Sequence, residues 1–134
     1  MLVGQEHVRR YIETDGAEGH DWLWATVLIL TTIGRHTRKS RSTPLTYGRR
    51  GDDYLVVASK GGSPTHPSWY LNLLEQPDVS VQVHGDHFAA SARTATAQEK
   101  PELWRLMTSK WPAYDQYQHN TTREIPVLVV ERAE

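Results

Sequence analysis

The order of predicted strands along the chain is the feature that most restricts its fold. Alternating and β-branched apolar residues predict six strands, over 25–33, 42–47, 54–59, 79–83, 87–95 and 125–130. The residues at 48–53 and 84–86 are typical of turns, so each joins its two flanking strands into a hairpin. A doubly wound parallel sheet would need a crossover helix between most strands, and the hairpins leave no room for one. We therefore predict a mostly antiparallel sheet that curls into a barrel, because closure removes exposed edges.

The segments between the strands predict a few peripheral helices. A short helix over 5–14 belongs to an N-terminal part, residues 1–24, that is helical or irregular. A second helix begins at Pro67 and ends before Pro77, and Thr96 with Glu99 has the spacing of a capping box ahead of a third. At 134 residues, the chain is expected to form a single domain over 1–134.

The composition restricts the chemistry. The chain has no cysteine, which excludes disulfides, a thiolate nucleophile and cysteine-ligated metals, so redox chemistry would need an external carrier. No histidine pair has metal-ligand spacing, and we predict no metal site. The longest apolar run, Ala25 to Leu30, is too short to span a bilayer, and Met1 to Arg10 lacks the apolar core of a signal peptide. These features predict a cytoplasmic protein, with peripheral membrane association left open.

A basic loop follows the first long predicted strand, in the sequence IGRHTRKSRSTP. Arg35, Arg38, Lys39 and Arg41 lie within this one loop, so their side chains can converge on an anion. Such a cluster is also compatible with a solvated charged loop or a nucleic-acid patch. The formal net charge of −1 argues against a surface built for nucleic acid, and we expect no nucleic-acid partner.

A glycine-containing segment, ASKGGSPTHPSWYLN, follows a later strand. Gly61 and Gly62 allow backbone to approach a ligand closely, Lys60 adds a charge, and the helix that begins near Pro67 offers free N–H groups. The spacing matches neither a Walker P-loop nor a dinucleotide fingerprint. By itself, the segment is also compatible with an ordinary loop between a strand and a helix.

Aromatic and amide side chains gather near this segment and again later in the chain. Trp69, Tyr70 and Asn72 combine flat apolar contact with an amide, which suits a heterocycle, although such aromatics more often belong to a core. Tyr114 and Tyr117 share a face if their segment is helical, where a phenol can donate a hydrogen bond or a proton.

Three motifs in order, LILTTIGRHTRKSRSTPL, YLVVASKGGSPTHPSWYLNL and WPAYDQYQ followed by TTREIPVLVVE, give the chain a family resemblance. From Ala25 to Glu131 it resembles the deazaflavin-dependent nitroreductases, a branch of the flavin and deazaflavin oxidoreductases. The resemblance implies an α+β, FMN-binding-like split β-barrel with six antiparallel strands. It also implies the deazaflavin coenzyme F420, a hydride carrier with a phosphate and an oligoglutamate tail. A polyanion of this kind is what the basic loop is expected to bind.

The resemblance further assigns roles to individual residues. Phosphate or tail carboxylates would be held by Arg35, Lys39 and Arg41. The strand beneath the cofactor would present Thr43, Pro44 and Tyr47. The deazaflavin or its phosphate would contact Val57, Ala58, Ser59, Lys60, Gly61 and Gly62. The pocket would be closed by His66, Pro67, Trp69, Tyr70 and Asn72. The catalytic candidates are Tyr114 and Tyr117, which match substrate-pocket tyrosines, and Ser59, which would orient the substrate.

The implied activity is transfer of hydride from reduced F420 to an electron-poor acceptor, namely a quinone, a nitro compound or an activated enone. The cofactor would carry the chemistry, and Tyr114 or solvent would donate the accompanying proton. An FMN-dependent split-barrel reductase and a non-catalytic barrel that binds a cofactor or nucleic acid are the alternatives. We expect a small-molecule acceptor as partner and a monomer or homodimer as the assembly.

Overall fold

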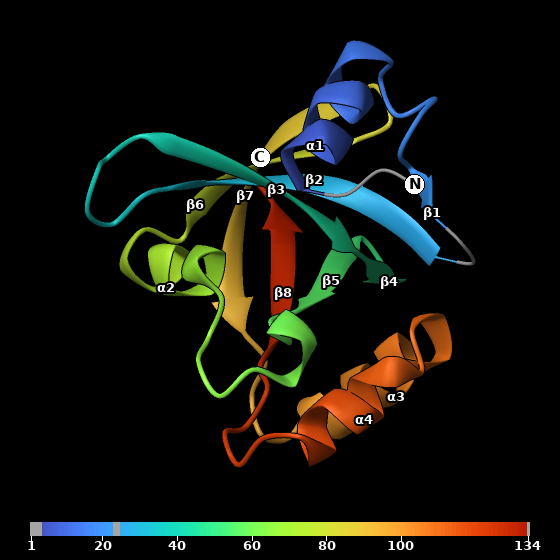
Figure 1. The fold of residues 1–134 in the computed structure, drawn as a ribbon, viewed down its shortest axis with the longest axis vertical. Helices are drawn as coiled ribbons and strands as arrows, with labels where there is room; N and C mark the ends of the chain where they lie inside the picture. Colours follow the sequence, from blue (N-terminus) through green and yellow to red (C-terminus); the bar gives the residue numbers. More distant parts are fainter. Residues whose placement is uncertain (1–3, 23–24, 134) are drawn as a thin grey trace.

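The computed structural model describes residues 4–22 and 25–133, which form one curled antiparallel sheet with helices around it (Figure 1). The strands are β1 (Asp21–Trp22), β2 (Ala25–Ile33), β3 (Ser40–Thr46), β4 (Gly48–Arg50), β5 (Asp53–Val57), β6 (Asp78–Val83), β7 (Asp86–Thr94) and β8 (Val127–Arg132). The helices are α1 (Gly4–Glu13), α2 (Ser68–Glu75), α3 (Lys100–Lys110), α4 (Ala113–His119) and a 3-10 turn, η1 (Lys60–Gly62). No helix in the described part of the chain is both long and apolar enough to cross a membrane.

The two edges of the sheet are connected by one short segment of the chain. Its order is β1-β2-β6-β7-β8-β5-β4, and β3 pairs with the other side of β2. Every pairing is antiparallel. Only Tyr47 separates β3 from β4, so one continuous segment connects the two edges of the sheet. The predicted antiparallel barrel is confirmed.

Alternation along the strands divides the apolar residues between an inner core and two outer layers, because successive side chains point to opposite faces. Leu28 and Leu30 of β2 belong to the inner core, as do Val56 of β5 and Leu128 of β8. The intervening residues Val27 and Ile29 instead pack under α1, against Val8 and Tyr11. In the same way, Leu55, Val57, Val127 and Val129 pack against Leu103 and Met107 of α3. Accordingly, Figure 1 shows α1 above the sheet and the α3–α4 pair below it.

The predicted capping box ahead of α3 is present. The backbone N–H of Thr96 donates to Oε1 of Glu99 at 2.8 Å, and the N–H of Glu99 donates to Oγ1 of Thr96 at 3.2 Å. These reciprocal bonds satisfy donors at the start of the helix, which begins at Lys100 with Pro101 in its first turn. The hairpin predicted over 79–95 is also confirmed, as β6 and β7 pair from Asp78↔Ser91 to Val83↔Asp86.

The predicted first hairpin is wrong. The strand 40–46 does not pair with 53–57; it pairs with β2, and the short strand β4 takes its place beside β5. With β1 and β4, the described residues form eight strands instead of the predicted six. The error arises at Gly48. Glycine is typical of turns, so the prediction placed it in a turn, but it lies in strand β4. A Cβ there would stand 2.7 Å from Sδ of Met107, so this glycine allows α3 to approach the sheet.

Candidate functional site

The basic loop is a tight connection between β2 and β3. The N–H of Gly34 donates to the Lys39 carbonyl at 2.8 Å, and the N–H of Arg38 donates back to the Gly34 carbonyl at 2.9 Å. Arg38 takes the left-handed conformation, with φ of 62°, which completes the turn. The loop therefore has a defined backbone from which its cationic side chains project.

Asn72 of α2 attaches this loop to the rest of the molecule. Its Oδ1 accepts the backbone N–H of Arg35 at 3.1 Å and the Arg35 guanidinium at 2.9 Å. Its Nδ2 donates to Oγ1 of Thr32 at 3.3 Å, and the side chain is only 4 % exposed. The Arg35 guanidinium also reaches the Ser68 carbonyl at 3.4 Å. Asn72 thus fixes Arg35 in position. The sequence predicted a contact of Asn72 with a heterocycle, not this role.

A hollow of about 390 Å³ opens where the loop, β3 and the first turn of α2 meet. We call it the basic hollow. Five of the predicted cofactor residues meet there, namely Arg35, Arg41, Thr43, Trp69 and Asn72. The other lining residues are Gln5, Gly34, His36, Thr37, Ser42 and Ser68. Residues far apart in the sequence therefore converge on one concave surface.

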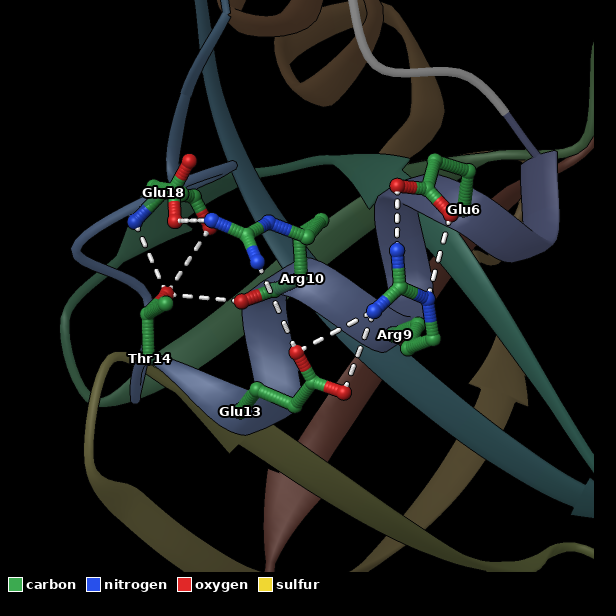
Figure 2. Close-up of polar contacts among 6 residues, drawn as sticks. All are labelled: Glu6, Arg9, Arg10, Glu13, Thr14 and Glu18. Carbon is green, nitrogen blue, oxygen red and sulfur yellow. Dashed lines mark hydrogen bonds and ion pairs between the residues drawn. The ribbon is translucent and has the colours of Figure 1, made fainter.

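Several cations of the protein pair with carboxylates. Figure 2 shows one such group, in which Arg9 pairs with Glu6 and Glu13, and Arg10 pairs with Glu13 and Glu18. Among the described residues, no carboxylate forms an ion pair with the cations of the two candidate loops, which are Arg35, Arg38, Lys39, Arg41 and Lys60. Concentrated positive charge without internal compensation favours an anionic ligand.

The glycine turn, residues 60–62, has backbone that depends on its glycines. The φ angles of Lys60, Gly61 and Gly62 are 46°, 63° and 84°, all in the left-handed region. A Cβ at Gly62 would lie 2.7 Å from the carbonyl oxygen of Tyr117, so Gly62 allows the turn to pack on α4. A Cβ at Gly61 would meet nothing within 4 Å. Gly61 is therefore the position in this turn where a ligand can approach backbone.

Arg123 holds the glycine turn in place, and the sequence analysis did not identify it as a functional residue. Its guanidinium donates to the carbonyls of Ser59 and Ser63, each at 2.7 Å, and to that of Ala58 at 3.2 Å. It also contacts Nδ1 of His66 at 3.2 Å. Burial lowers the pKa of Arg123 from its usual value, but a guanidinium stays charged at neutral pH. One side chain thus ties together both ends of the turn.

Two predicted cofactor residues, His66 and Tyr70, line a different hollow of about 320 Å³. We call it the side hollow. Its remaining lining residues are Thr94, Ala95, Ala97, Lys100, Glu124, Pro126 and Val127. The Tyr70 hydroxyl lies 3.2 Å from Oγ1 of Thr94, and Lys100 forms an ion pair with Glu124 at 3.0 Å. The structure therefore divides the predicted pocket between two concave surfaces.

The predicted substrate tyrosines lie between α4 and the sheet. Tyr114 is 6 % exposed and packs in the cluster beneath α3 and α4. Burial raises the pKa of Tyr114, and a hydrogen bond with the Thr46 side chain opposes that effect in part. The Tyr117 hydroxyl accepts the indole N–H of Trp111 at 3.3 Å. The structure thus brings the two rings together, with centroids 6.1 Å apart, but places the Tyr114 ring in the core.

The other predicted residues mainly contact other parts of the protein. Val57 and Ala58 are buried in the two main cores, and the backbone of Ala58 is already bonded, its N–H to the Pro126 carbonyl and its carbonyl to Arg123. The Tyr47 hydroxyl hydrogen-bonds Nε2 of His20 at 2.8 Å. Pro44 pairs with Ile29 across the β2–β3 ladder, and Pro67 precedes the first residue of α2. The Ser59 carbonyl is taken by Arg123 and by the Gly62 N–H.

Comparison with known proteins gives consistent matches over nearly the whole chain. The sequence model of the F420H(2)-dependent quinone reductases matches residues 3–132. An F420H(2)-dependent quinone reductase of Mycobacterium tuberculosis is 40% identical over 130 residues, which cover 94% of this chain and 87% of that protein. A solved structure described as an F420-H2 dependent reductase is 40% identical, with a TM-score of 0.73, over 78% of this chain and 93% of its own. A further solved structure, described as a domain-swapped dimer, is 37% identical with a TM-score of 0.76, over 95% of this chain and 96% of its own.

Proposed function

The chain belongs to the F420H(2)-dependent quinone reductase family, and on that basis we propose that it transfers hydride from reduced F420 to a quinone-type acceptor. The structural observation that carries the proposal is the basic hollow, where Arg35 and Arg41 line a concave surface without a carboxylate partner among the described residues. A phosphate or glutamate carboxylate supplies the charge that this surface lacks. The prediction of an oxidoreductase that uses F420 and belongs to this group of enzymes agrees with these comparisons.

Arg35 and Arg41 are proposed to bind the phosphate or tail carboxylates of the cofactor. Arg35 is held on Asn72 before any ligand arrives, so little conformational entropy is lost when it binds. Each charge-assisted hydrogen bond contributes roughly 1.5–3 kcal/mol where water is partly excluded. Lys39 lies exposed on the same loop and is proposed to contact the outer part of the tail.

The heterocycle is proposed to lie near the glycine turn. The open space above Gly61 fits a flat ring placed against backbone, and Lys60 adds a positive charge next to it. Thr43 and Trp69 extend this surface from the basic hollow. Val57 and Ala58 are buried, so they would support this surface from beneath, and Ser59, which is partly exposed, would contact the ring.

The bound cofactor supplies hydride, and the residues of this chain position the reactants and exclude water. A quinone that accepts hydride also needs one proton to become a hydroquinone. Because burial raises the pKa of Tyr114, this phenol keeps its proton at neutral pH. We propose that solvent supplies the proton and that Tyr114 and Tyr117 shape the pocket wall, with Ser59 as a contact to the acceptor.

We further propose a cytoplasmic enzyme that acts on small molecules, as a monomer or homodimer and without a nucleic-acid partner. The absence of cysteine and the near-neutral net charge support this proposal. A homodimer would parallel the solved relative that is described as a domain-swapped dimer.

Turnover provides the test. Purified protein is mixed anaerobically with reduced F420 and menadione, and the return of oxidised deazaflavin is followed by absorbance, with FMN and NADPH in parallel. We expect rapid oxidation of reduced F420 only, with quinone and protein both required. Equal or faster menadione reduction with reduced FMN would assign the chain to a flavin-dependent activity and contradict the proposal.

A further inference from the structure

The bonds of Arg123 organise the glycine turn instead of neutralising a carboxylate. Its guanidinium donates to the carbonyls of Ser59 and Ser63, which flank the turn, at 2.7 Å each. Among the described residues it forms no ion pair. Within the turn, Lys60 takes the left-handed conformation, with φ of 46°, which is unfavourable for a residue that carries a Cβ. The turn is therefore not a conformation that its own residues prefer, and Arg123 stabilises it.

Gln118 of α4 holds the segment from which Arg123 projects. Its Nε2 donates to the Arg123 carbonyl at 2.8 Å, and its Oε1 accepts the N–H of Ile125 at 2.9 Å. These two bonds attach the segment between α4 and β8 to the helix, and the buried Ile125 packs in the same cluster as Tyr114. The backbone of Arg123 is thereby fixed relative to α4, while its side chain is fixed relative to the glycine turn.

The glycine turn and α4 also touch directly. Gly62 packs against the backbone of Tyr117, where a Cβ would lie 2.7 Å from the carbonyl oxygen. The two elements are therefore joined in two ways, by close packing at Gly62 and by the hydrogen bonds of Arg123 and Gln118. The packing sets a minimum separation, because atoms cannot overlap, and the hydrogen bonds keep the two elements from moving apart.

We propose that Arg123 and Gln118 set the distance between cofactor and acceptor by holding the glycine turn against α4. This inference rests on the proposed function, in which the deazaflavin ring lies at the glycine turn and Tyr114 and Tyr117 of α4 shape the acceptor pocket. Transfer between two bound reactants requires the reacting atoms to be about 3–3.5 Å apart, and a displacement of about 1 Å can lower the rate by about 100-fold. Arg123 and Gln118 are positioning residues, because they act on the turn and on α4 and not on the reactants.

Two variants test the proposal, one for each residue. Arg123→Lys keeps the positive charge but offers one donor nitrogen in place of three, and Gln118→Leu removes the bonds to Arg123 and Ile125 without changing the turn itself. We expect each variant to lower kcat with menadione by about 10- to 100-fold. The dissociation constant of F420 should rise by less than about fivefold, because the proposed contacts in the basic hollow remain.

Single-turnover kinetics separate positioning from a loss of folded protein. With enzyme in excess over reduced F420 and with saturating menadione, the rate constant of deazaflavin oxidation reports the geometry of the bound reactants, and the amplitude reports the folded fraction. The rate constant should fall in both variants, whereas a merely structural role would lower only the amplitude. Gln116→Leu and Arg105→Lys are the controls, since both side chains are exposed, on α4 and α3, and both variants should behave as wild type.

Hydrogen exchange provides a readout that needs no turnover. The Gly62 N–H donates to the Ser59 carbonyl at 2.9 Å, so its exchange rate reports opening of the glycine turn. We expect this amide to exchange faster in Arg123→Lys and Gln118→Leu, with the amides of β6 and β7 unchanged. Unchanged Gly62 exchange in both variants would overturn the inference, as would unchanged single-turnover rate constants or a loss of F420 affinity equal to the loss of rate. If wild type reduces no quinone, the proposed function fails, and the exchange rate alone decides whether the two residues hold the glycine turn against α4.

Discussion

Replacement of Asn72 by leucine should weaken both the fold and cofactor binding. The two side chains have the same branching and the same number of non-hydrogen atoms, so the main change is the loss of three hydrogen bonds, two from Arg35 and one to Thr32. The backbone N–H of Arg35 loses its only partner among the described residues. The Arg35 guanidinium lines an open hollow and can be rehydrated in part.

The magnitude follows from these losses. A donor left unsatisfied in a part-buried position costs about 1–3 kcal/mol, and a lost charge-assisted bond adds about 1 kcal/mol after rehydration. We expect Asn72→Leu to lower the free energy of unfolding by about 2–4 kcal/mol, which corresponds to a fall of about 7–15 °C in Tm for a chain of this size. F420 affinity should fall by about tenfold, because Arg35 is no longer held in position before binding.

Urea unfolding and a fluorescence titration with F420 measure the two effects. Gln116→Leu is the matched control, because Gln116 is exposed on α4 and its side chain bonds, among the described residues, only the exposed side chain of Asn120, so its effect should stay within about 0.5 kcal/mol. A stability loss in Asn72→Leu no greater than in the control would refute the role of Asn72 in holding the loop. A large stability loss with unchanged F420 affinity would show that Arg35 does not contact the cofactor.

Three further predictions concern the basic loop, the glycine turn and the capping box. Arg41→Ala should weaken F420 binding by roughly 10- to 100-fold in a titration, and Arg38→Ala should have a smaller effect that disappears at high salt; equal losses would indicate a diffuse electrostatic patch. Gly62→Ala should lower the free energy of unfolding in urea by more than about 2 kcal/mol, because its Cβ meets Tyr117. Gly61→Ala should lower it by only about 1 kcal/mol but should weaken F420 binding. A larger loss of F420 affinity in Gly62→Ala than in Gly61→Ala would contradict the proposed close approach at Gly61. Hydrogen bonds from Arg93 and from the Thr96 N–H hold the pKa of Glu99 at about 2, below its usual 4.5, so its stabilisation is present above pH 4.5 and is lost as pH falls toward 2. Glu99→Gln should therefore be less stable than wild type by about 1 kcal/mol at pH 7 and nearly equal to it near pH 2, and a constant difference across this range would exclude the linkage.

Local patterns were sufficient for the parts of the fold that depend on neighbouring residues. The β6–β7 hairpin follows from strand alternation around His84-Gly85-Asp86, and the capping box before α3 follows from the spacing of Thr96 and Glu99. The pairing of β3 with β2 depends on the conformation of the basic loop, including the left-handed backbone at Arg38, which residue type does not indicate. The positive charge of this loop indicated a binding segment, and the sequence did not indicate that the loop also joins β2 and β3 as a hairpin turn.

The candidate site was predicted in part. The convergence of Arg35, Arg41 and Trp69 on one hollow agrees with the expected anion site, although it leaves the individual cofactor contacts as proposals. Arg123 could not be identified, because its partners are backbone carbonyls about sixty residues earlier in the chain and carry no sequence signal. The separation of His66 from the basic hollow likewise depends on how α2 is placed against the sheet, which only tertiary packing determines.

A competitive binding titration tests the central claim most directly. Oxidised F420 is titrated into the wild-type protein by fluorescence, at low and moderate salt, and FMN is then added as competitor. We predict that F420 binds in preference to FMN, that its affinity falls as salt rises, and that Arg41→Ala removes most of this salt dependence. Equal or tighter binding of FMN, or F420 binding that is unaffected by both salt and the loss of Arg41, would contradict the assignment of the basic hollow to the deazaflavin cofactor.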